Sequence, residues 1–99
     1  MSVLLVTYDL LKRGQNYDGF HKVIKSYEWK QLSESSYAIK TGETPQMVFN
    51  KLAPYMDAND HVYVINLRKP LWYYGPKSVN EWLEANLPEA AVTYNPFFK

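Results

Sequence analysis

The sequence predicts an α+β fold in which two helices pack on one side of a four-stranded antiparallel sheet. Three observations lead to this prediction. Two apolar runs, residues 3–8 and 61–67, have the composition of strands. Two segments between them carry apolar residues at helical spacing, and residues 29–41 read as a hairpin. The element order is therefore β-α-β-β-α-β.

The first strand and first helix come from residues 3–27. Residues 3–8 predict a strand that is buried on both faces, because four consecutive residues are apolar, and Asp9 follows it directly. A polar loop leads to a helix, for which we expect Asn16 to be the N-cap. The apolar residues of this segment, at i, i+3, i+4 and i+7, are Phe20, Val23, Ile24 and Tyr27.

The hairpin and second helix follow. Residues 29–41 predict two short strands joined by a turn at residues 33–35. Thr44 is the expected N-cap of the second helix, since Pro45 then occupies the first helical position. We expect Pro54 to end or bend the last turn. The apolar stripe of this helix is predicted to be Val48, Leu52, Tyr55 and Met56.

The fourth strand is predicted at residues 61–67, after a turn at residues 57–60. An aromatic loop follows, in which we expect Trp72 to pack over the sheet. Residues 78–81, Ser-Val-Asn-Glu, have the form of a capping box, so a third helix is expected to begin there and to end near residue 86. Its predicted apolar face is Val79, Trp82 and Leu83, and residues 91–94 predict a short terminal strand.

The 99 residues are expected to form a single domain, 1–99, with a core at 2–67 and a C-terminal extension at 68–99. With right-handed crossovers, the element order gives the ferredoxin-like arrangement, with strand order 4-1-3-2 and both helices on one face. The end of strand one then lies beside the start of strand four. The third helix covers part of the helix-free face, and we expect a second copy of the chain, in a homodimer, to cover the rest.

Composition narrows the function classes. The absence of cysteine excludes disulfides, thiolate metal sites and cysteine nucleophiles. The N-terminal apolar run is shorter than the ~20 residues of a membrane span and lacks the charged flank of a signal peptide, so we expect a cytoplasmic protein with no membrane partner. A net charge of +1 gives no overall attraction for nucleic acid, so phosphate contacts require a local basic cluster.

Residues 2–67 resemble a known family. Tyr8-Asp9 ends the first strand, an amphipathic helix follows, residues 32–39 form a serine-containing hairpin, and Asp60 opens the fourth strand. This succession resembles the second CRISPR-associated protein (Cas-two-like), the small nuclease-fold subunit of the CRISPR adaptation complex, and the related virulence-associated protein D family. The loop at residues 12–16 is longer than in that family, and Glu34 replaces an expected glutamine.

The resemblance implies a ferredoxin-like homodimer whose C-terminal strand adds to the partner's sheet. It also implies that Asp9 is the catalytic residue and, with its symmetry mate, the ligand of Mg²⁺ or Mn²⁺, which would activate water and a phosphoryl group. Read from the residue alone, Asp9 is an ordinary turn residue that bonds nearby N–H groups. Asp60 and His61 could assist from the neighbouring strand, with His61 as a general base. We favour the ordinary roles, in which Asp60 finishes a turn and His61 lies at the strand edge, and we expect no catalytic role for His21 or His61.

Two basic clusters are candidates for nucleic-acid contact. Lys12 and Arg13 follow Asp9, and Arg68 and Lys69 precede an aromatic run of the kind on which bases stack. The predicted function is a nucleic-acid-binding homodimer that acts as a metal-dependent endonuclease on RNA or DNA. The alternatives are a non-catalytic nucleic-acid or protein scaffold, or adaptor, and a metabolite-sensing regulatory module, for which this fold is also common.

Overall fold

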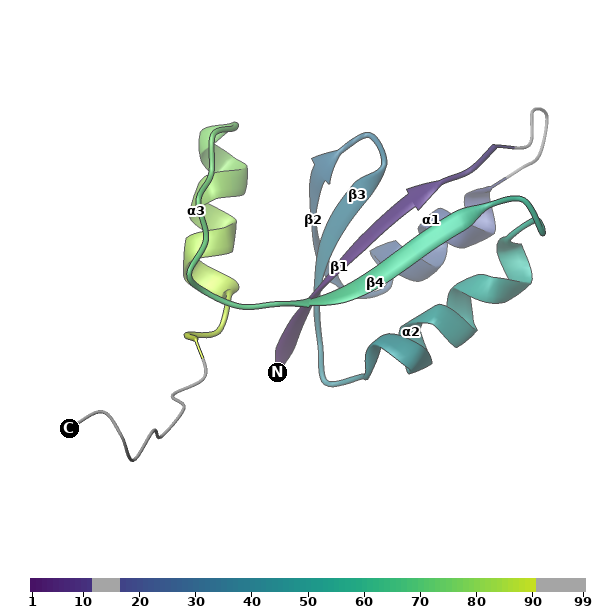
Figure 1. Cartoon of the computed structure of the whole chain (residues 1–99), viewed down its shortest axis with the longest axis horizontal. Coiled ribbons are helices and arrows are strands. Elements are labelled where there is room, and N and C mark those ends of the chain that lie inside the picture. Colours follow the sequence, from purple (N-terminus) through teal and green to yellow (C-terminus); the bar gives the residue numbers. More distant parts are fainter. Residues whose placement is uncertain (12–16, 91–99) are drawn as a thin grey trace, which may run out of the picture.

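A computed structural model describes residues 1–11 and 17–90. It contains one antiparallel sheet with helices packed against it (Figure 1). The elements in chain order are β1 (Ser2–Asp9), α1 (Asp18–Lys25), β2 (Glu28–Ser33), β3 (Ser36–Thr41), α2 (Pro45–Leu52), the 3₁₀ turn η1 (Ala53–Tyr55), β4 (His61–Leu67) and α3 (Lys77–Asn86). The terminal strand predicted at residues 91–94 lies outside the described residues.

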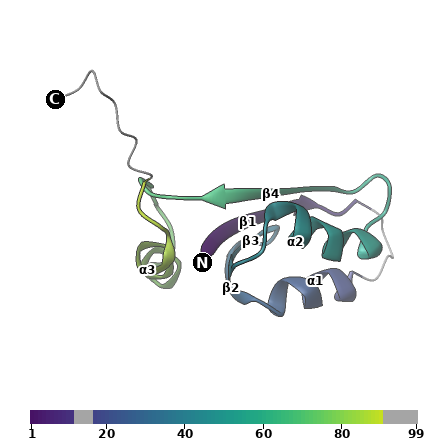
Figure 2. The same ribbon diagram turned by 90° about the horizontal axis from the view of Figure 1, so that it is seen from below.

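The strand order is β2-β3-β1-β4, which is the predicted order 4-1-3-2 read from the other edge. Each neighbouring pair is antiparallel. Figure 2 shows α1 and α2 together on one side of this sheet. The predicted two-layer α+β architecture is therefore confirmed.

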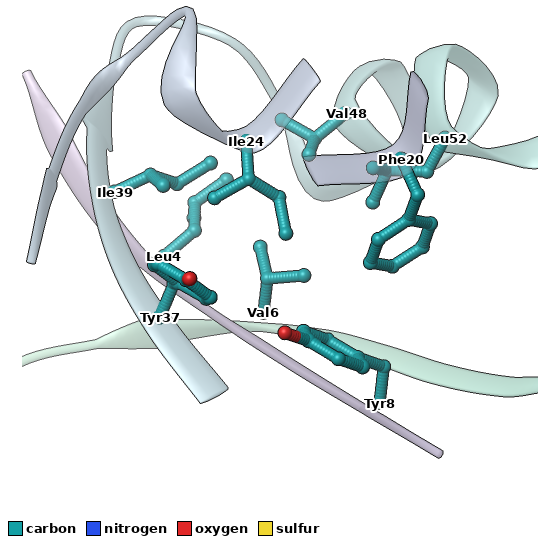
Figure 3. Close-up of a cluster of buried hydrophobic side chains, with 9 residues drawn as sticks. All are labelled: Leu4, Val6, Tyr8, Phe20, Ile24, Tyr37, Ile39, Val48 and Leu52. Atoms are coloured by element: carbon teal, nitrogen blue, oxygen red, sulfur yellow. The ribbon is translucent and has the colours of Figure 1, made fainter. Parts of the chain in front are cut away.

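The main core lies between the sheet and these two helices. Every second residue of β1 points into it, and the helices contribute the apolar positions that the sequence predicted (Figure 3). Its buried members are Leu4, Val6, Tyr8, Phe20, Ile24, Tyr37, Ile39, Val48 and Leu52. Because burying one such aliphatic side chain is worth about 1.5–3 kcal/mol, this cluster supplies most of the force that holds the layers together.

Tyr8 links this core to the surrounding loops. Its ring meets Phe20 edge-on with centroids 4.9 Å apart. Its hydroxyl lies 3.1 Å from Nε2 of His21 and 3.2 Å from the carbonyl oxygen of Glu34, to which it donates. Burial, helped by the neighbouring Tyr37, raises the pKa of Tyr8 to about 12, so it remains a hydroxyl donor at neutral pH.

The helix ends agree only in part with the sequence. Thr44 is the N-cap of α2, because its hydroxyl accepts the N–H of Met47 at 3.2 Å. Pro54 also acts as predicted, since the α-helix stops at Leu52. Tyr55 consequently leaves the predicted stripe, is 44% exposed and packs its ring on Gly19. The N-cap position of α1 is Tyr17 rather than Asn16, which lies outside the described residues.

The capping box predicted at residues 78–81 is wrong. Pro76 occupies the N-cap position of α3, and its extended backbone (φ −57°, ψ 141°) lets the helix begin at Lys77. Ser78 is therefore already inside the helix, and no side chain caps the helix start. Instead, the Asn80 side chain donates to the Gly75 carbonyl at 2.9 Å and ties the preceding loop to the helix.

The predicted apolar face of α3 is confirmed. Leu83 is buried, and Val79 and Trp82 pack beside it in a second cluster that includes Val3 and Ala38 of the sheet. Both sheet residues belong to the face opposite α1 and α2. Since α3 lies at the end of the sheet where β1 begins (Figure 2), it covers only that end of the helix-free face.

Candidate functional site

The candidate site lies where β1 ends. Asp9 is the last residue of β1 and is the register partner of His61, the first residue of β4. Directly opposed residues of an antiparallel pair share a face, with Cβ atoms about 4.5–5.5 Å apart. Both side chains are exposed and lie on the helix-free face, since Tyr8 points into the core. The pairing therefore brings a carboxylate and an imidazole together.

The predicted position of His61 is confirmed. The sequence placed the start of strand four beside the end of strand one, and the register opposes His61 directly to Asp9. The expectation that His61 has no catalytic role stays a prediction, because the pairing shows only where this side chain lies.

The Asp9 carboxylate has no hydrogen bond or ion pair to any residue in the ranges 1–11 and 17–90. The sequence left open that Asp9 is an ordinary turn residue that bonds nearby N–H groups. Within these ranges, Asp60 makes such bonds and Asp9 does not. The Asp60 carboxylate accepts the N–H of Leu11 at 2.9 Å, the N–H of Asp57 at 2.7 Å and the Tyr17 hydroxyl at 2.9 Å. Asp60 thus fastens both loops beside the site and leaves Asp9 available.

The bonds to Asp60 set its charge state. Burial by itself raises the pKa of this carboxyl. The opposing effect is larger and comes from four neighbours that stabilise the carboxylate: the N–H groups of Asp57 and Leu11, the Tyr17 hydroxyl and the nearby His61. The net result is a pKa below the ordinary value. Asp60 is therefore a carboxylate at neutral pH whose oxygens are already engaged by the protein, which makes it a structural anchor rather than a metal ligand.

One chain does not supply a complete metal site in the part of the sequence that the structure describes. No group of three or more histidine, aspartate or glutamate side chains is placed there to hold an ion. Asp9 and His61 together amount to two side chains of ligand type. Because Mg²⁺ is usually held by one or two carboxylates with several waters and substrate phosphates, an ion at Asp9 needs ligands from outside the chain.

Beside Asp9 lies a strip of apolar side chains that no element within residues 1–11 and 17–90 covers. Tyr63 is 63% exposed and Ile65 is 48% exposed, and both face away from α1 and α2. Leu5, the register partner of Ile65, lies next to them on the inner strand and is half-buried. We call Leu5, Tyr63 and Ile65 the open strip. It runs along the helix-free face from the α3 end toward Asp9.

The structure describes one of the two predicted basic clusters. Arg68 and Lys69 follow β4, whose last residue pairs with Val3, so they lie at the end of the sheet away from Asp9. Lys69 is engaged by Glu89 at 3.3 Å and by Glu84 at 3.5 Å. The hydrogen bond to Glu89 holds the pKa of Lys69 above its ordinary value, although burial opposes it. Lys12 and Arg13 lie outside the described residues.

The expectation that Trp72 packs over the sheet is wrong. Trp72 is 95% exposed and Tyr74 is 103% exposed, whereas Leu71 packs against the α3 cluster in their place. The apolar anchor of this loop is thus Leu71 rather than Trp72. The loop therefore offers two free aromatic rings at the same end of the molecule as Arg68.

No protein-family model matches this sequence. Function must therefore be inferred from the placement of the residues. Across residues 1–11 and 17–90, none of the helices combines the length and the apolar character needed to cross a lipid bilayer.

We predict that Asp60→Asn destabilises the protein at neutral pH, because an amide presents N–H groups to the Asp57 and Leu11 donors. The fall in melting temperature should be about 5–10 °C at pH 7, measured by circular dichroism. Since the folded pKa of Asp60 is lowered, its stabilisation is present above the unfolded pKa of about 3.8 and is lost as pH falls through the folded value. The difference from the wild type should therefore shrink below pH 4.

The matched control is Asp9→Asn, which makes the same chemical change at a carboxylate without a partner among the described residues. It should leave the melting temperature nearly unchanged at both pH values. An Asp60→Asn difference that stayed constant from pH 7 to pH 3 would show that the carboxylate charge is not what anchors these loops.

Proposed function

We propose that this protein is a homodimeric nucleic-acid-binding protein that cleaves phosphodiester bonds with Mg²⁺ or Mn²⁺ bound by Asp9 of both chains. The observation that supports this function best is the exposure of Asp9, with no partner among the described residues, at the end of an uncovered apolar strip. A second copy placed on that strip would bring another Asp9 to the same region.

The second copy is the occupant that fits the open strip best. The strip consists of Leu5, Tyr63 and Ile65, without a charged side chain among them, and large exposed apolar groups of this kind mark protein contacts. A two-fold axis buries the same patch on both chains, so one self-complementary surface is sufficient. The resemblance to dimeric nuclease subunits, found from the order of the sequence motifs, points to the same partner.

The unpaired edge of β4 provides a second contact for the partner. An open groove runs along this edge beside α2 and is lined by Phe49, Met56, Val62 and Tyr63 among others. Edge strands with free N–H and C=O groups accept an added strand, and an apolar groove holds its alternate side chains. A strand from the partner, as the resemblance implies, suits this edge.

The proposed chemistry assigns limited roles to the protein. Two Asp9 carboxylates, together with water and a substrate phosphate oxygen, satisfy the ligand number that Mg²⁺ prefers. A bound ion supplies polarisation of the phosphoryl group and a lower pKa for a bound water. The chain holds the Asp9 carboxylates on a rigid strand end, while Asp60 keeps the neighbouring loops from competing for them.

Nucleic acid would be held by cations and aromatic rings from two parts of the chain. Arg68 is exposed and has no ion pair within residues 1–11 and 17–90, and Trp72 and Tyr74 offer faces for base stacking. Lys12 and Arg13 follow Asp9 in the sequence. Because the net charge is only +1, we expect binding to depend on these few cations and to weaken as salt rises.

A non-catalytic scaffold is the second candidate. It is favoured by the exposure of Trp72 and Tyr74, which equips the protein to hold a strand without any chemistry at Asp9. The engagement of Lys69 by two glutamates also removes one cation from the binding surface, at the end opposite to Asp9. The metabolite-sensing alternative remains a prediction from the sequence alone.

The dimer is tested by Ile65→Glu. Placing a carboxylate in the open strip would bury two like charges across the two-fold axis, so the dissociation constant of the dimer should rise by roughly 100-fold. Sedimentation velocity at micromolar concentration measures the change. Met47→Glu is the matched control, because Met47 is 47% exposed on α2, close to the 48% of Ile65, but lies on the other side of the molecule. A wild type that sediments as a monomer would contradict the proposal.

The catalytic proposal is tested by Asp9→Asn. We expect it to lower the rate of Mn²⁺-dependent cleavage of labelled RNA or DNA by at least about 100-fold, because the ion contributes several kcal/mol to the transition state. Salt-dependent binding should persist. Glu34→Gln, at the exposed hairpin turn, should cleave at the wild-type rate. Binding without metal-dependent cleavage in the wild type would reject the nuclease and support the scaffold.

A further inference from the structure

The two histidines of this chain stand in different environments. His21 has both ring nitrogens engaged: Nδ1 lies 3.1 Å from the Tyr17 carbonyl oxygen, and Nε2 lies 3.1 Å from the Tyr8 hydroxyl. His61 is exposed and makes no hydrogen bond or ion pair within the described ranges. His21 is therefore part of the fold, whereas the nitrogens of His61 are available for a ligand.

The available imidazole lies beside the available carboxylate. His61 and Asp9 are register partners on the helix-free face, and the next pair inward on that face is Tyr63 with Thr7. His61 and Tyr63 also line the open groove at the edge of β4. An acid and a histidine directly opposed on two strands are close enough to bind one ion, and the strands fix both side chains at their Cα positions.

We propose that His61 is a second metal-binding residue, and that its imidazole makes the site prefer Mn²⁺ over Mg²⁺. The proposal rests on the proposed function, because the complete site takes one Asp9 and one His61 from each chain. Imidazole nitrogen suits first-row transition metals, whereas Mg²⁺ favours oxygen ligands and dehydrates reluctantly. Mn²⁺ accepts carboxylate and imidazole together, so a mixed Asp–His site binds Mn²⁺ in preference to Mg²⁺.

The mixed site also gives the ion more protein ligands than two carboxylates can. Two carboxylates alone leave an ion dependent on water and substrate for most of its ligands. Adding His61 from both chains gives four protein ligands and leaves positions for water and a substrate phosphate oxygen. The ion would then bind the protein without nucleic acid, which allows binding to be measured separately from cleavage.

The experiment is a titration of the EDTA-treated full-length protein with MnCl₂ in the absence of nucleic acid. Electron paramagnetic resonance counts the free Mn²⁺, and the electron spin echo of the bound ion reports a coordinated imidazole through nitrogen modulation. We expect one Mn²⁺ per two chains, with nitrogen modulation. His61→Asn should abolish the modulation and raise the Mn²⁺ dissociation constant by at least about tenfold, while changing Mg²⁺ binding little.

His21→Asn is the matched control and should keep both the nitrogen modulation and the affinity for Mn²⁺. Should that variant fail to fold, because it breaks the bond to Tyr8, Glu34→Gln serves in its place. Bound Mn²⁺ without nitrogen modulation, or equal effects of His61→Asn on Mn²⁺ and Mg²⁺, would overturn the proposal for His61 and leave the Asp9 site intact.

The absence of Mn²⁺ binding by the wild type would also overturn the proposal that His61 binds a metal ion. Sedimentation of the same sample then distinguishes the two failures. A dimer without bound ion would remove the metal site but preserve the proposed assembly, whereas a monomer would remove the assembly on which both proposals rest.

Discussion

The register of β1 between β3 and β4 is the constraint on which the rest of the molecule depends. It sets Leu4, Val6 and Tyr8 against the helices and leaves Asp9 on the other face, paired with His61. A shift of one residue would carry the core side chains into solvent and Asp9 into the core, so the burial of the apolar residues fixes the position of the acid. The Asp9 carboxylate is thus positioned by packing that it takes no part in.

Two polar anchors hold the ends of this arrangement. Tyr8 joins the end of β1 to α1 through His21 and to the hairpin through the Glu34 carbonyl. Asp60 joins the loop after β1 to the turn before β4, because it accepts from Leu11, Tyr17 and Asp57. Asp9 and His61 lie between these anchors and have no bond of their own within the described residues. In the proposed site, these two side chains bind the metal while the anchors hold the elements that carry them.

Much of the fold could be predicted from the sequence because local patterns of apolar and capping residues determine it. Apolar periodicity located the sheet and the helices, and Thr44-Pro45 marked the start of α2 correctly. The errors arose where two local signals competed: Pro76 starts α3 before the serine of the expected capping box, and anchoring of Leu71 leaves Trp72 in solvent. The predicted topology already placed the start of strand four beside the end of strand one, but only the register shows that His61 directly opposes Asp9. The open strip likewise needed the position of α3.

In the proposed assembly, two chains associate through the helix-free face and bring their Asp9 residues together. The chain has no cysteine, so Asp9→Cys carries a single spin label, and pulsed dipolar spectroscopy of the dimer measures the distance between the two labels. We expect a distance shorter than the length of β1, which is about 26 Å for its eight residues. A longer distance in a dimer, or no dipolar coupling at all, would contradict the shared site.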